Sequence, residues 1–395
     1  MTSTGPARQA SLRERNLATV ARAVVDAPEP LSRADVAART GMTRATVSTL
    51  VDQLIEAGLL TELPAVSSGP GRPAVPLAPA ARTVVGLGLE VNVDYLGGRV
   101  VDLTGEVVDE IVIAENLRGS PAPATLERLG HLARDLMARA RGMRVAGAHL
   151  ALPGLVDTRA NLLRIAPNLG WSDVEPLALL GLPASLPATV GNEAKLAALA
   201  QLWGCPVAER ASRTFLYVSG DVGIGAAIVI DGALFGGKRG WSGELGHVTV
   251  DPAGPTCRCG ASGCLERYAG KEVLVTDVGL DIDVADDVLV DRLSAPDART
   301  AVSTAGAALG QAMADAVNLL DIDRVLLGGV YTGLVPLLRP AITEQLRTRV
   351  LGAPWAPVDV VPAPVADHAA LTGGAAASLR AVVEDPMPWI AAAAG

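Results

Sequence analysis

One histidine and three cysteines lie close together in the middle of the chain: His247 is followed by Cys257, Cys259 and Cys264. Three thiolates and one imidazole form the closed tetrahedral donor set that zinc prefers, and glycines between them allow a tight turn. The sequence therefore predicts a structural Zn²⁺ in a loop spanning residues 247–264. Because protein fills all four positions, no open position remains for metal-bound water. The alternative is a group of buried free thiols beside an unrelated histidine.

Polar side chains near this loop have the chemistry to hold a sugar. Glu244 precedes His247 by three positions, and Glu266 follows the last cysteine by two. Asn192 and Glu193 stand where an expected strand ends and an expected helix begins, a place where α/β folds commonly bind ligands. Carboxylates and an amide can hydrogen-bond several adjacent hydroxyls. We expect these five residues to form a sugar site, with zinc on one nitrogen of His247 and the ligand on the other. The alternative for each carboxylate is an ordinary surface position.

The N-terminal residues carry the pattern of a helix-turn-helix. Apolar residues recur at helical spacing over Ser11–Ala27. Ser32 can cap a second helix, Arg33–Arg39, with Asp35 completing a capping box, and Thr43 can cap a third helix that runs to Ala57. A short turn containing glycine separates the second and third helices, which is typical of DNA-binding modules.

Small, polar and basic residues mark the expected DNA-reading surface. On the third helix they suit insertion into a major groove. Leu59–Leu63 and Val75–Leu77 are expected wing strands, and the Gly/Pro-rich segment between them carries one arginine that could reach a phosphate or the minor groove. The candidate DNA-binding residues are Thr43, Arg44, Thr46, Ser48, Thr49 and Arg72. We therefore predict a winged helix-turn-helix domain over residues 1–80; the alternative is a three-helix protein-interaction or dimerisation module.

Residues 83–395 alternate strand and helix patterns and predict an α/β domain with two lobes and a ligand between them. A strand meander is expected over Val84–Leu89, Arg99–Leu103 and Val107–Ala114. Long helices are expected over Leu126–Arg141 and about Ala301–Leu320.

Charge is unevenly distributed along the 395 residues. The net charge is −9, but residues 1–82 hold nine arginines and seven acidic residues (+2), which leaves 24 basic and 35 acidic residues (−11) in the rest. This balance excludes a protein that coats nucleic acid and fits a small DNA-reading module on an acidic body. We find neither an apolar signal segment nor a membrane span in the sequence, so we expect a cytoplasmic protein.

The motifs around the cysteines resemble the signature of the ROK family (repressors, open reading frames, kinases). The carrying segments are Gly243–His247 and Cys257–Glu266, with Pro167–Trp171, Gly191–Glu193 and Leu327–Gly329 in the expected order. Arg44–Leu60 and Gly71–Pro73 look like the winged helix of the family's repressors. The resemblance implies an actin-like, ribonuclease H-like sugar-kinase fold, sugar contacts by Asn192, Glu193, Glu244, His247 and Glu266, and the four zinc ligands. It also implies that operator DNA is bound by a homodimer or homotetramer.

Two departures from the family's kinases bear on activity. Those kinases open with a phosphate loop of the form Asp-x-Gly-Gly-Thr-Lys, whereas Glu90–Tyr95 has no glycine and no lysine and adds Asp94. Glycines let backbone N–H groups approach phosphate, and an added carboxylate repels it. The kinase base is an aspartate, and here the position holds Glu193, which is one methylene longer. We therefore expect no enzyme but a repressor of carbohydrate-metabolism genes that responds to a sugar or sugar phosphate. The alternatives are an ATP-dependent hexose kinase with a DNA-binding head, and a sensor whose residues 1–80 bind protein.

Overall fold

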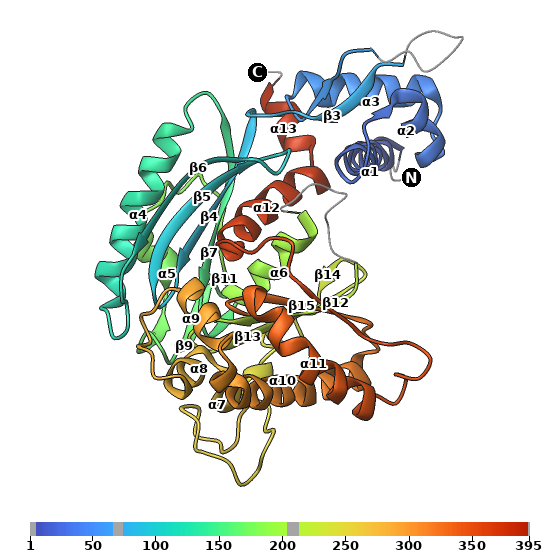
Figure 1. Ribbon diagram of the computed structural model, residues 1–395. Coiled ribbons are helices and arrows are strands. Elements are labelled where there is room, and N and C mark those ends of the chain that lie inside the picture. The colour runs from blue at the N-terminus through green and yellow to red at the C-terminus, as the bar shows by residue number, and fades with distance from the viewer. Residues whose placement is uncertain (1–4, 66–73, 204–212, 394–395) are drawn as a thin grey trace.

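The computed structural model describes residues 5–65, 74–203 and 213–393. The N-terminal module contains three helices and a small sheet of strand order β1-β3-β2, blue in Figure 1. Its elements are α1 (Gly5–Val25), β1 (Leu31–Ser32), α2 (Arg33–Thr40), α3 (Arg44–Glu56), β2 (Leu60–Glu62) and β3 (Pro76–Pro79).

Local hydrogen bonds fix the helix-turn-helix. The backbone N–H of Asp35 donates to Oγ of Ser32 at 3.2 Å, and its carboxylate accepts from the Ser32 N–H at 2.9 Å, which forms the predicted capping box. Helix α2 ends at Gly41, whose φ of 72° is a left-handed conformation that glycine adopts without strain. Thr43 caps α3 by accepting the N–H of Thr46 at 3.2 Å. The predicted helix-turn-helix is therefore confirmed. Helix α2 ends one residue later and α3 one residue earlier than predicted, whereas α1 begins at Gly5 instead of Ser11 and ends at Val25 instead of Ala27.

The first lobe of the body is a five-stranded sheet of order β11-β7-β4-β5-β6. Its strands are β4 (Val84–Val91), β5 (Tyr95–Asp102), β6 (Val107–Ala114), β7 (Arg144–Leu152) and β11 (Ala188–Asn192). The meander β4-β5-β6 is antiparallel as predicted, whereas β7 and β11 add parallel strands. Helix α4 (Ala122–Arg139) covers one face, where Leu126 and Leu129 pack with Leu87 and Leu89. A short helix, α5 (Pro176–Leu180), and a small sheet of β8 (Leu155–Asp157), β9 (Leu162–Ala166) and β10 (Trp171–Val174) complete the lobe.

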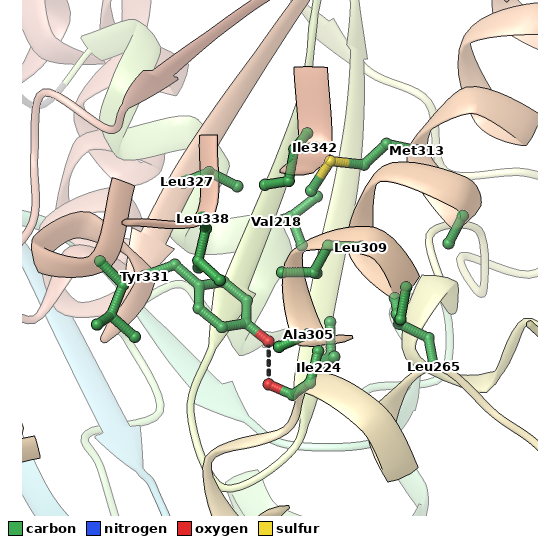
Figure 2. Close-up of a cluster of buried hydrophobic side chains, with 14 of the residues drawn as sticks. Val218, Ile224, Leu265, Ala305, Leu309, Met313, Leu327, Tyr331, Leu338 and Ile342 are labelled. Atoms are coloured by element: carbon green, nitrogen blue, oxygen red, sulfur yellow. Dashed lines mark hydrogen bonds between the residues drawn. The ribbon is translucent and has the colours of Figure 1, made fainter. Parts of the chain in front are cut away.

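The second lobe is another five-stranded sheet, of order β14-β13-β12-β15-β16. Its strands are β12 (Phe215–Gly220), β13 (Ile224–Ile230), β14 (Ala233–Leu234), β15 (Arg324–Gly329) and β16 (Asp359–Pro362). Its helices are α7 (Glu266–Ala269), α8 (Lys271–Asp277), α9 (Asp286–Leu293), α10 (Arg299–Leu320) and α11 (Tyr331–Arg349), with 3-10 turns at Leu245–His247 and Pro296–Ala298. Figure 2 shows its core, in which Leu309 and Met313 lie near Val218. The buried Tyr331 hydroxyl donates to the carbonyl of Ala269 at 2.6 Å, so this polar group is satisfied inside the core.

Two helices lie between the sheets of the lobes: α6 (Glu193–Trp203) and α12 (Ala369–Glu384). They pack closely because glycines face backbone. A Cβ built on Gly373 of α12 would lie 1.7 Å from the carbonyl oxygen of Leu196, and one built on Gly88 of β4 would lie 1.8 Å from that of Leu371. The two helices therefore touch each other and the first sheet at backbone distance.

The C-terminal helices α12 and α13 (Met387–Ala393) also pack against the N-terminal module. Leu379 and Val382 of α12 share one buried cluster with Leu17 and Val20 of α1. Arg144 at the start of β7 donates to the carbonyl of Ala57 and lies over the Trp389 ring of α13. No sequence pattern predicted this contact, which joins the two ends of the chain.

The observed architecture confirms the predicted fold class, an N-terminal winged helix-turn-helix followed by a two-lobed α/β body. Across the described ranges we find no helix long and apolar enough to cross a membrane.

Candidate functional site

The four predicted metal ligands lie together. One donor atom from each of His247, Cys257, Cys259 and Cys264 lies within 4.8 Å of the others. Nδ1 of His247 is 3.8 Å from Sγ of Cys257, and Sγ of Cys259 is 3.6 Å from Sγ of Cys264. Tetrahedral coordination with Zn–S bonds of about 2.3 Å places sulfurs roughly 3.8 Å apart. The cluster is therefore the right size to hold one metal ion.

Backbone contacts shape this loop before any metal is considered. The N–H of Cys257 donates to Ala261 at 2.7 Å, and the N–H of Val250 donates to Gly263 at 2.8 Å. Gly263 has φ 70°, and a Cβ there would lie 1.6 Å from the carbonyl oxygen of Asp251. Only glycine fits this position, so the turn that gathers the ligands depends on it.

All five predicted sugar residues line one small cavity, of about 90 Å³, between the lobes. They reach it from different elements: Asn192 ends β11, Glu193 begins α6, Glu244 precedes the 3-10 turn, His247 ends that turn, and Glu266 begins α7. His247 thus belongs to both the cysteine cluster and the cavity wall. Its Nδ1 faces the sulfurs, which leaves Nε2 as the other donor or acceptor of the ring.

Protein contacts hold two of these side chains in place. Asn192 accepts the N–H of Lys195 at 3.2 Å, which caps α6, and donates to the carbonyl of Gly154 at 3.1 Å. Glu266 accepts the N–H of Ile224 at 3.2 Å, and a Cβ on Gly223 would lie 2.3 Å from its carboxylate. Asn192 therefore has one remaining amide hydrogen for a ligand, and the glycine makes room for Glu266.

Burial perturbs the carboxyl groups of the cavity. It raises the pKa of Glu193 well above its usual range, and the carboxylates of Asp221 and Glu90 add to this shift. Burial also raises the pKa of Glu244, against the opposing charges of His247 and Lys195. The raised pKa values favour the protonated carboxyl, which can donate as well as accept hydrogen bonds to hydroxyls.

A much larger cavity, of about 940 Å³, adjoins the small one through a shared wall of Asn92, Glu193 and Asp221. The stretch Glu90–Tyr95 lines it. Burial raises the pKa of Glu90 to about 7, and Oε2 of this carboxyl has no hydrogen-bond partner within the described chain. Helix α12 contributes its first residues, Ala369 and Ala370, to the same cavity.

Several residues that line the two cavities were not among the predicted site residues. Asn92 donates to Glu193 at 3.4 Å and lines both cavities, while Asn168 and Arg258 line the small one. Arg258 stands between two cysteines of the predicted zinc loop, and its guanidinium donates to Asn168 at 3.1 Å. Asn168 lies in the Pro167–Trp171 motif, Asn92 lies in the stretch Glu90–Tyr95, and Arg258 lies inside the cysteine motif, so the sequence carried a signal for all three.

The predicted DNA-reading residues gather at the start of α3. Thr43, Arg44, Thr46 and Thr49 are exposed there, and Ser48 is half-buried. The first turn of α3 carries no acidic residue. Arg72 lies outside the described residues.

Comparison with known proteins gives the relationships of the chain. The model of the ROK family matches residues 86–381, and that of the MarR family matches residues 18–69. The xylose repressor of Bacillus spizizenii is 27% identical over 81% of this chain and 84% of its own length. The DNA-binding transcriptional dual regulator NagC of Escherichia coli is 27% identical over 94% of both chains.

Solved structures agree with this assignment. A ROK family transcriptional regulator, described as a homologue of the E. coli MLC protein, superposes with a TM-score of 0.78 at 24% identity, over 97% of this chain and all of that one. A ROK hexokinase from Thermus thermophilus superposes with a TM-score of 0.60 at 27% identity, over 74% of this chain and 97% of that one. Since the family model matches residues 86–381, a range that includes the cysteine motif and the five cavity residues, this chain is a member of the ROK family.

Proposed function

We propose that this chain is a sugar-responsive transcriptional repressor of carbohydrate-metabolism genes. Residues 1–80 serve as the winged helix-turn-helix that reads operator DNA, and residues 83–395 serve as the sugar-binding body. Relatives that match 81% and 94% of this chain are named as a xylose repressor and a DNA-binding regulator, which supports this function. In this proposal the protein acts in the cytoplasm and binds operator DNA as a homodimer or homotetramer.

The small cavity is the sugar site in this proposal. Glu244, Glu266 and Nε2 of His247 contact the hydroxyls, and Asn192 and Glu193 complete the set. A Zn²⁺ ion on Nδ1 of His247 and the three cysteines would fix the ring orientation, so the metal has a structural role. The fit of the cluster to tetrahedral zinc supports this assignment.

The position of helix α12 supports the proposal that sugar binding regulates DNA binding. Its first residues line the larger cavity, and its second half packs against α1 of the DNA-reading module. A sugar that draws the lobes together would act on this helix at one end and change the position of the module at the other. Such a ligand shifts DNA binding only as far as it prefers one lobe arrangement over the other.

Kinase activity is absent in this proposal. In the kinases a phosphate loop supplies glycines and a lysine, whereas here the corresponding turn after β4 carries Asp94. The carboxyl of the buried Glu90 lines the same cavity. The structural similarity to a ROK hexokinase is the observation that favours the alternative, an ATP-dependent hexose kinase. A coupled assay of ADP release over a panel of hexoses distinguishes a kinase from a regulator without kinase activity. We expect no turnover above background, and clear turnover with any hexose would contradict the proposal.

Operator binding is tested with DNA from upstream of the protein's own and neighbouring genes. We expect a footprint at physiological salt, with affinity that falls as salt rises. Replacing Arg44 with alanine should weaken binding by roughly 5- to 100-fold. Arg347→Ala, on an exposed face of α11, is the matched control and should leave affinity unchanged. Absence of sequence-preferring binding by the native chain would refute the function.

A further inference from the structure

The sugar cavity opens onto a strongly acidic space. Ten carboxyl side chains line the larger cavity against a single lysine, and they include Glu90, Asp94, Glu193, Asp221, Asp286 and Asp291. Glu193 and Asp221 also line the small cavity, beside Glu244 and Glu266. A substituent on a bound sugar therefore meets carboxyl groups whether it stays within the small cavity or passes the shared wall into the large one.

The cations of these walls already have anionic partners. Nζ of Lys271 lies 2.7 Å from Asp286, and Nη2 of Arg258 lies 2.7 Å from Glu272. The ring of His368, which lines the larger cavity, packs edge-on against Tyr95, and burial lowers its pKa, so it is neutral near pH 7. Among the described lining residues, no unpaired ammonium or guanidinium is left to receive a phosphate.

Helix α12 points its N-terminus at the larger cavity, and such an end favours anions. Asp367, two residues before the helix, places a carboxylate at that same end. The helix end that would otherwise favour a phosphate therefore lies next to the fixed negative charge of Asp367. Sites that bind sugar phosphates need the opposite arrangement, with arginine or lysine aimed at the phosphate.

We infer that the effector is an unphosphorylated, uncharged sugar, and that the acidic lining of the two cavities, which leaves no cation among the described lining residues free to pair with a phosphate, excludes its phosphorylated form. This inference rests on the proposed sugar site and chooses between the two effector classes that the sequence left open. Specificity here comes from repulsion of the unwanted ligand rather than from added contacts to the wanted one. Asp221 is the residue that acts most directly, because it lines both cavities without being among the proposed sugar contacts.

Calorimetric titration of the full chain, saturated with zinc, tests the inference at 0.15 M salt. The paired probes are glucose with glucose 6-phosphate and N-acetylglucosamine with its 6-phosphate; xylose is a further neutral probe. We expect a neutral sugar to bind, and a phosphate of the same sugar to bind at least about 100-fold more weakly, because like charges meet without compensation. A 6-phosphate that binds as tightly as its parent sugar, or more tightly, would overturn the inference and leave the sugar site standing.

Variants separate exclusion by charge from exclusion by size. Asp221→Asn preserves the shape and should narrow the preference for the neutral sugar by about 10-fold or more while changing neutral-sugar affinity by less than about 3-fold. Asp94→Asn, at a half-buried position, repeats the test if the first variant folds poorly. Asp315→Asn, exposed on α10, is the control and should change nothing. An unchanged preference in both cavity variants would refute a charge mechanism. If neither neutral nor phosphorylated sugars bind the native chain, the proposed sugar site itself fails.

Discussion

Arg380 and Asp26 join the last long helix of the body to the first helix region of the DNA-reading module. Nη1 of Arg380 lies 2.9 Å from both carboxylate oxygens of Asp26, across 354 positions of sequence. The pair is largely shielded, with side-chain exposures of 14% and 29%. Arg380 also lies over the Trp203 ring at the end of α6. One side chain thus contacts α6, α12 and the end of α1.

A double-mutant cycle of Arg380→Ala and Asp26→Ala should measure a coupling energy of about 1 kcal/mol in denaturant unfolding. The value exceeds that of typical surface pairs because the two groups are partly desolvated and both oxygens are engaged. The exposed pair Arg347 and Glu344 is the control, and its coupling should be smaller because solvent screens both charges. A coupling of zero for Arg380 and Asp26 would show that the contact does not hold the module.

The same ion pair should matter for regulation. In Arg380→Ala we expect sugar affinity to stay within about 2-fold of the native chain, since the residue is remote from the cavity. The change in operator affinity caused by the sugar should shrink, because one link between α12 and the module is lost. Both quantities come from fluorescence anisotropy of labelled DNA with and without sugar. Full retention of the sugar effect would contradict transmission through this contact.

Close packing of α12 on α6 predicts a steep cost for a single methyl group. Gly373→Ala would place its Cβ 1.7 Å from a backbone oxygen of α6, so one helix must move. We expect a loss of unfolding free energy of more than about 2 kcal/mol. Gly352→Ala, with no atom within 4 Å of the new Cβ, should change stability by less than about 0.5 kcal/mol. Similar values for the two variants would mean that the helices do not meet at backbone distance.

Removal of the metal should destabilise the body. We expect one zinc per chain by elemental analysis and a melting temperature that falls by at least about 5 °C with a strong chelator, because a metal bound only by the folded state stabilises it. Cys257→Ser should lose the zinc and show the lower melting temperature without chelator. Cys205→Ser, at a cysteine outside the predicted site and outside the described residues, is the control and should keep its zinc. A metal-free native chain of unchanged stability would refute the zinc assignment.

The buried carboxyl of Glu90 predicts a pH dependence of stability. Burial raises its folded-state pKa to about 7 from an ordinary value of 4.5. The folded state therefore holds this proton more tightly than the unfolded state does, so its contribution is fully present below pH 4.5 and is lost as pH rises through 7. Glu90→Gln keeps the shape without the charge, and its stability curve should lack this loss, which amounts to at most about 3 kcal/mol.

Denaturant unfolding of both proteins between pH 4.5 and 8 measures the difference. Glu106→Gln, at an exposed turn after β5, is the control for removal of one carboxylate. Parallel curves for the native chain and Glu90→Gln would show that this group does not titrate abnormally.

Local spacing by itself determined the helix-turn-helix, the meander of β4, β5 and β6, and the cysteine loop. Caps such as Ser32 and Thr43 act within three or four residues, and the cysteine ligands are brought together by a short glycine turn, so the sequence pattern is sufficient. The polar residues Glu244 and Glu266 flank that loop, which made them identifiable as candidates, although nothing local fixed their distance from Asn192.

Tertiary structure alone decided what joins these parts. Helix α12 consists mostly of alanine, glycine and leucine, and most of its residues are buried between the two sheets. Its sequence therefore lacks the alternation of apolar and polar faces that identifies a surface helix. Its contacts with Leu196 and Asp26 join residues more than 150 positions apart, whose placement comes from packing rather than periodicity. The link between the cavity and the DNA-reading module could therefore be found only in the folded chain.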